Sequence, residues 1–193
     1  MAKDVRSLFA GIKDASAKVD AEYDGPGHYL ERIEKVKVDQ NRKGVRFFAV
    51  EKTVIHVFDN AGGHPDAHRV GDSTTFMVMQ SSEYFKIEVK AFVKSVLEED
   101  LDAKSEDEIL DVIQAIVDDS QPLAGTVVEM RNHNRLKKDK KPEDENAFFT
   151  KVKFVREVPA SELLEVLTDD EKSRFYPGDQ LEKMIEAEKK QAA

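Results

Sequence analysis

The sequence predicts a mostly β protein with α additions, built on a five-stranded barrel of element order β-β-β-α-β-β with helical arms at both ends. Three observations predict this fold class: period-two runs rich in β-branched residues early and late in the chain, two helical periodicities between them, and helical patterns at the termini. The expected parts are an N-terminal helical arm at 1–22, a barrel at 23–159 with a helical insertion at 81–118, and a C-terminal helical extension at 160–193.

The N-terminal arm and the first half of the barrel follow from these patterns. Apolar residues at helical spacing between 5 and 12 predict a short helix, and "YDGPGH" ends it because glycine and proline favour turns. Residues 28–38 and 45–58 predict a long β-hairpin, since both runs are β-prone and a short polar turn joins them. A glycine-rich loop separates this hairpin from a third predicted strand at 73–80.

The middle of the chain changes to helical periodicity. Apolar side chains within 85–96 share one helical face, which predicts a helix. Ser105 and Glu108 form a capping-box pattern in front of a second apolar stripe at 109–117. The insertion is therefore expected to contain two helices.

Strands at 126–136 and 147–158 are expected to complete the sheet, with the charged segment "KKDKKPEDEN" between them, and helical patterns resume beyond Pro159. This element order is that of the oligonucleotide/oligosaccharide-binding (OB) barrel. In that fold ligands bind on the second and third strands and on the loops that join strands one to two and four to five. A small α+β sheet protein with the same order is the alternative.

Charge is distributed unevenly along the chain, whose formal net charge is −9. Residues 131–156 hold nine lysines and arginines against four acids, whereas residues 98–119 hold ten acids and one lysine. The turn at 41–46 is also basic. Both loops that flank the ligand in an OB barrel are thus expected to carry positive charge, which suits the phosphates of a nucleic acid.

The last predicted strand has the residue types that bind single-stranded nucleic acid. Alternation places Phe149 on the same side as Lys151 and Lys153, whereas Phe148 should face the core. Basic side chains hold phosphates, and an aromatic ring stacks on a base with a contribution of about 1–3 kcal/mol.

The predicted strand at 45–58 divides less cleanly between two faces. Phe48 and Phe58 share a side with Arg46 but also with valines, so burial in the core is the alternative role for both rings. The residues expected to contact nucleic acid are Arg42, Lys43, Arg46, Phe48, Lys52, Arg131, His133, Arg135, Phe149, Lys151 and Lys153.

Signatures of other chemistry are missing. The chain has no cysteine, and phosphate-loop, dinucleotide-binding and hydrolase motifs do not occur. His64, Asp66 and His68 are residue types of a zinc site, but the glycine and proline around them favour a solvated loop. We therefore expect no metal, no cofactor and no catalytic activity.

The segments "GHYLERIEKVKV", "KGVRFFAVEKTVIH", "HRVGDSTTFMV", "GTVVEMRNHNRL" and "FFTKVKFV" resemble the single-stranded DNA-binding proteins of bacteriophages, over Gly27 to Val158. The resemblance implies an OB barrel that coats and protects single strands during replication or recombination, in the host cytoplasm. It also implies replication or recombination proteins as partners. The C-terminal "GDQLEKMIEAEKKQAA" has mixed charge and a helical pattern, unlike the acidic tail with which such proteins recruit replication partners. This difference favours a role of the C-terminal helix in self-association.

Two other functions remain open at this point. A structural or adaptor protein of a phage particle would use the helices at 83–117 and the terminal arms to hold protein neighbours. A metal-dependent nuclease is the third possibility. No apolar run approaches the roughly 20 residues of a membrane span, so no membrane partner is expected.

Overall fold

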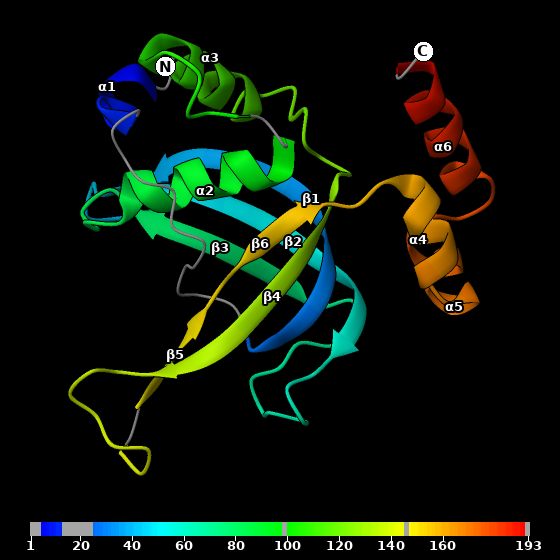
Figure 1. Ribbon diagram of the computed structural model, residues 1–193, viewed down its shortest axis with the longest axis horizontal. Helices are drawn as coiled ribbons and strands as arrows, with labels where there is room; N and C mark the ends of the chain where they lie inside the picture. Colours follow the sequence, from blue (N-terminus) through cyan, green and yellow to red (C-terminus); the bar gives the residue numbers. More distant parts are fainter. Residues whose placement is uncertain (1–4, 13–24, 98–99, 145–146, 192–193) are drawn as a thin grey trace.

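A computed structural model of the chain describes residues 5–12, 25–97, 100–144 and 147–191 (Figure 1). The elements in chain order are α1 (Val5–Phe9), β1 (Gly27–Gln40), β2 (Arg46–Asp59), β3 (Ser73–Met79), α2 (Phe85–Leu97), α3 (Glu106–Ile116), β4 (Val127–Leu136), β5 (Phe148–Lys151), β6 (Phe154–Glu157), α4 (Ala160–Val166), α5 (Asp169–Phe175) and α6 (Gln180–Gln191). Each predicted strand and each helix of the insertion is present, and the last predicted strand is divided into two.

The strands form one antiparallel sheet in the order β3-β2-β1-β4-β5, and β6 pairs with β4 next to β5. The expectation of an antiparallel β protein with helical additions is confirmed in this coarse form, as a mixed α/β protein with a six-stranded sheet. The closed five-stranded barrel is wrong. Closure requires the last strand to pair with the third, but within the described residues both halves of that strand pair with β4 and neither pairs with β3.

The last predicted strand is interrupted at Val152 and Lys153, between β5 and β6. The side-chain oxygen of Asn132 accepts a hydrogen bond from the Lys153 N–H (3.4 Å), and the Lys153 carbonyl accepts one from the Arg131 N–H (2.9 Å). Val152 is nevertheless buried, as is Phe154 two residues later. The alternation of buried and exposed residues therefore continues through the interruption and conceals it in the sequence.

Helices pack against both faces of the sheet, and α4, α5 and α6 lie beside one end of it (Figure 1), so that neighbouring strand residues belong to two separate cores. Val54 and Val128 lie in the larger core with α1, α2 and α3, on what we call the inner face. The adjacent Ile55 and Val127 lie in the smaller core with α4, α5 and α6, on the outer face. Adjacent residues on a strand point to opposite faces, so each core belongs to one face.

The described parts of both terminal segments contribute side chains to the two cores. Phe9 is fully buried, and its ring stacks on that of Phe85 with 5.1 Å between the ring centroids. At the other end, Leu163 and Leu181 are buried in the smaller core. Positions 1–4 and 13–22 of the expected N-terminal arm lie outside the described residues.

The larger core contains an ion pair between Lys52 on β2 and Glu31 on β1. The Lys52 Nζ lies 2.5 Å from the Glu31 Oε2, and both side chains are 0% exposed. The Thr74 hydroxyl donates a hydrogen bond to the same oxygen (3.1 Å), and the lysine Nζ lies 5.4 Å from the centroid of the Phe154 ring. Each charge thus depends on the other for compensation of its lost hydration.

Candidate nucleic-acid interface

The outer face of the sheet presents cationic side chains where the C-terminal half of β4 meets its neighbours. Residues directly opposite in antiparallel strands share a face, and so do alternate residues along a strand. The opposed pairs here are His28 with Arg131, His133 with Lys151, and Arg135 with Phe149. These six residues therefore lie on one side of the sheet, and we call them the basic face. It unites five of the predicted contact residues with His28, which the sequence did not single out.

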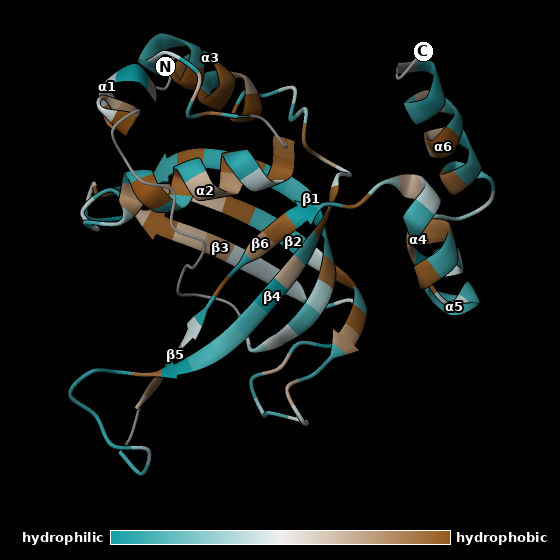
Figure 2. Ribbon diagram, viewed as in Figure 1, coloured by the Kyte–Doolittle hydropathy of each residue, from teal (hydrophilic) through white to brown (hydrophobic). Residues whose placement is uncertain are grey.

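The β4–β5 hairpin projects past the body of the protein (Figure 1). The C-terminal half of β4, which belongs to this hairpin, and the loop that follows it are hydrophilic (Figure 2). On its inner side, Phe148 lies opposite Leu136 and is 45% exposed. The prediction that Phe148 faces the core is wrong, because α2 packs on β6 and the hairpin extends beyond it. Only Phe149, on the outer side, adjoins the basic residues.

A second ring continues the basic face onto β2. Phe58 is 45% exposed, and its ring centroid lies 4.4 Å from that of His28 and 4.7 Å from that of His56. His56 in turn pairs with Glu171 of α5, at 3.0 Å between Nδ1 and Oε2. The ring of Phe58 thus contacts two histidine rings near the end of its strand.

A β-bulge explains why Phe58 is exposed although Phe48 has the same sequence parity. Leu30 pairs with His56 and Glu31 with Val54, so Ile55 is an extra residue on β2. An extra residue reverses the faces of the residues that follow it, up to the next register shift. That shift comes at the end of β2, where Tyr29 pairs with Val57 and His28 with Asp59, so Phe58 is itself an extra residue. Alternation from the start of β2 could not reveal this.

Two predicted contact residues, Phe48 and Lys52, are buried on the inner face and were assigned wrongly to the interface. Phe48 is 0% exposed and packs against Phe9 and Phe92. Lys52 forms the buried ion pair with Glu31. The physical reason is that both residues precede the bulge and so share a face with the core valines of β2.

Three other predicted contacts lie at the far end of β1. Arg42 and Lys43 are exposed in the turn between β1 and β2, and Arg46 begins β2 opposite Gln40. The basic face meets β1 at its opposite end, at His28. The structure therefore does not bring the two basic loops together. Lys153, the remaining predicted contact, is half-buried between β5 and β6.

Glu129 connects the basic face to α4. Its Oε1 accepts hydrogen bonds from the Nε2 of His28 (3.0 Å) and the Nη2 of Arg131 (2.9 Å), and its Oε2 accepts one from the Nε of Arg156 (3.1 Å). Arg156 also pairs with Glu162 of α4 (2.8 Å). Burial raises the pKa of Glu129, but the hydrogen bonds from Arg131 and His28 outweigh it and leave that pKa below its ordinary value. The ionised carboxylate therefore holds Arg131 in position.

A pocket of about 560 Å³ adjoins the basic face. The pairing of β1 with β4 ends at Gly27 and Asn132. Beyond this point the loop after β2 lines the pocket together with the next residues of β4. A 3.0 Å hydrogen bond between the side chains of His64 and Asn134 ties that loop to β4. The polar side chains around the pocket include those of His28, Asp59, His64, Arg131, His133 and Asn134.

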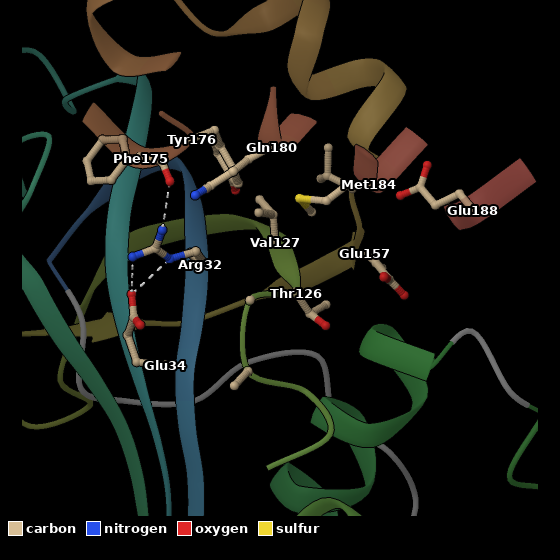
Figure 3. Close-up of a pocket in the computed structure, with 13 residues that line it drawn as sticks. Arg32, Glu34, Thr126, Val127, Glu157, Phe175, Tyr176, Gln180, Met184 and Glu188 are labelled. Atoms are coloured by element: carbon tan, nitrogen blue, oxygen red, sulfur yellow. Dashed lines mark hydrogen bonds and ion pairs between the residues drawn. The ribbon is translucent and has the colours of Figure 1, made fainter. Parts of the chain in front are cut away.

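A second pocket, of about 610 Å³, lies between the sheet and the C-terminal helices (Figure 3). Arg32 is fixed there by Glu34 (2.9 Å) and by the carbonyl of Phe175 (3.2 Å). Burial raises the pKa of Tyr176 to about 12, and its hydroxyl has no hydrogen-bond partner among the described residues. The Glu157 carboxylate borders the same pocket, which makes it a poor site for phosphate.

Other kinds of site find little support in the described ranges. No three histidines or carboxylates there lie close enough together to hold a metal ion. His64 and His68 instead bond to Asn134 and to the main-chain N–H of Gly25. None of the described helices combines the length and apolar character needed to cross a membrane. No protein-family model matches the chain, and a search of curated proteins gives no match either.

Proposed function

We propose that the protein binds single-stranded DNA and coats and protects it during phage replication or recombination, without catalysing a reaction. The observation that carries this proposal is the basic face, where cationic side chains surround Phe149 on one side of a projecting hairpin. Replication or recombination proteins, or a second copy of the chain, are the partners that accompany this role, and the host cytoplasm is the place for it.

A single strand of DNA has two kinds of group that this face can bind. The exposed Arg131 and Arg135 offer guanidinium groups to phosphates, and the exposed lysines of the loop at 137–141 extend the positive charge. The half-buried ring of Phe149 offers its accessible part as a stacking surface for a base. Stacking and phosphate contacts are tolerant of base sequence, which suits a coating protein.

The topology supports a relation to the OB barrel. Three antiparallel strands precede the helices, and the order β3-β2-β1-β4-β5 is what remains when a five-stranded barrel lacks the pairing between its third and last strands. We infer an opened OB-like sheet, as the resemblance to phage single-stranded DNA-binding proteins implies.

Fluorescence anisotropy with a labelled oligothymidine tests the proposal. Binding through about four phosphates gives a slope of about −3 for log K against log salt concentration. Phe149→Ala should weaken binding about 5–150-fold, the equivalent of one stacked base. Phe148→Ala is the matched control, because this neighbouring ring lies on the other side of the hairpin. Lack of salt-sensitive binding at low ionic strength would refute the proposal, and preference for a duplex competitor would show that the hairpin reads double strands.

One observation favours a structural or adaptor protein as the second candidate. Leu136 and Phe148 form an exposed apolar pair on the inner side of the hairpin. The helices first expected as the adaptor interface bury their apolar faces in the two cores. Under this alternative, Phe148→Ala disrupts assembly and Phe149→Ala leaves it intact. The third candidate, a metal-dependent nuclease, requires that DNA is degraded when it is incubated with the protein and magnesium or zinc. Intact DNA after this incubation rules it out.

A further inference from the structure

We propose that the pocket between β1, β4 and the loop after β2 forms, together with the ring of Phe58, a second nucleotide-binding subsite that takes one base and its adjoining phosphate. This inference rests on the proposed function, because the ligand is a further part of the same DNA strand. It extends the interface from the hairpin across the sheet to β2.

The path between the two rings is continuous on the outer face. Phe149 lies opposite Arg135, and four residues back along β4 Arg131 lies opposite His28, whose ring contacts Phe58. Strand spacings of about 4.8 Å and residue rises of about 3.4 Å place the two rings roughly 20 Å apart. Several nucleotides must therefore lie between them, over the cationic side chains of β4.

The base side of the subsite is restricted by its neighbours. The ring of Phe58 is inclined by 33° to that of His28 and by 78° to that of His56, with centroid distances of 4.4 Å and 4.7 Å. These contacts restrict the ring before a ligand arrives. A ring that is already restricted loses less side-chain entropy on binding, so more of the stacking energy contributes to affinity.

The phosphate side of the subsite is Arg131. Its side chain is 59% exposed, and Glu129 accepts hydrogen bonds from its Nε (3.1 Å) and Nη2 (2.9 Å). The remaining nitrogen of the guanidinium, Nη1, makes no hydrogen bond within the described residues, so its N–H groups are left for a phosphate oxygen. The Asp59 carboxylate on the opposite wall repels phosphate, so the phosphate binds on the β4 side. The volume of about 560 Å³ is within the range of small-ligand pockets.

The test compares Phe58→Leu, Phe149→Ala and Phe148→Ala in binding to an oligothymidine of 12 nucleotides. Phe58→Leu keeps an apolar side chain between the histidines but removes the ring face. We expect it to weaken binding at least fivefold without moving the midpoint of urea unfolding, and Phe148→Ala to bind like wild type. Because the two rings are far apart, the losses from Phe58→Leu and Phe149→Ala should multiply in the double variant.

Photo-crosslinking with 5-iodouracil in the same oligonucleotide gives an independent readout. Crosslinks in peptides that contain Phe58 or His28 support the subsite. Crosslinks confined to the β4–β5 hairpin, together with wild-type affinity of Phe58→Leu, overturn the subsite and leave the proposed function standing. If the wild-type protein does not bind the oligonucleotide, both proposals are overturned.

Discussion

Replacing Lys52 with methionine should lower the free energy of unfolding by about 3–5 kcal/mol. The two side chains of the Lys52–Glu31 pair are 0% exposed and their charged atoms are 2.5 Å apart, so the substitution leaves the carboxylate buried without this cation. The hydrogen bond from the Thr74 hydroxyl remains, but a neutral donor does not replace a charge.

The expected loss in free energy of unfolding arises because only one partner of the ion pair is removed. It does not require the intact pair to be strongly stabilising. Buried ion pairs exchanged for apolar residues of similar volume are often neutral or stabilising, so adding Glu31→Leu to Lys52→Met should recover most of the loss. Lys37→Met is the matched control. Lys37 pairs with Glu51 on the same two strands, but the side chains are 25% and 40% exposed, so the expected loss is below about 1 kcal/mol.

Urea unfolding followed by far-ultraviolet circular dichroism measures these free energies by linear extrapolation. If Lys52→Met destabilises no more than Lys37→Met, or if the double variant is as unstable as Lys52→Met alone, the reasoning is refuted. The double variant should also keep the affinity of the wild type for single-stranded DNA, because Lys52 lies inside the larger core.

The other predictions concern the C-terminal helices and the start of β1. Burial raises the pKa of Tyr176 to about 12, so stability should decrease between pH 10 and 12, and an ultraviolet titration in which every tyrosine ionises near pH 10 would contradict this. Burial raises the pKa of Glu171, but hydrogen bonds from the main chain and from His56 outweigh it and lower that pKa. The resulting stability is present above the ordinary value of 4.5 and lost as the pH falls below it, so in Glu171→Gln the urea midpoint should vary less between pH 3 and 6 than in wild type. Gly27→Ala should destabilise the fold by about 1–3 kcal/mol, because Gly27 has a φ of +149° and a Cβ there would lie 2.2 Å from the Tyr29 Oη. An unchanged melting temperature would contradict that expectation.

The helices were predictable because their signals are local. Ser105 and Glu108 form the reciprocal capping box that the sequence indicates, and Thr168 and Glu171 form another. Strand positions were predictable for the same reason, since alternation and β-branched residues mark each run. Closure of the sheet was not predictable, because it depends on pairing between strands about 70 residues apart in the chain.

The candidate site was predictable only where alternation is uninterrupted. The outer positions of β4 and β5 follow a strict period of two, so Arg135 and Phe149 were assigned to one face correctly. The extra residue Ile55 breaks that period in β2, so Phe48 is buried and Phe58 is exposed although alternation placed them on one side. Neither residue type nor spacing marks this bulge, because isoleucine is an ordinary strand residue.

The shared carboxylate of Glu129 has a thermodynamic consequence. It bonds to Arg131 on the proposed DNA-binding side and to Arg156, which pairs with Glu162 on α4. If a bound phosphate weakens the hydrogen bonds between Arg131 and Glu129, the carboxylate is left to Arg156, and occupancy of the face is then linked to the docking of α4. Linkage of this kind is reciprocal. If docking of the helices changes the affinity for a DNA strand by a given factor, binding of that DNA strand changes the docking equilibrium of the helices by the same factor.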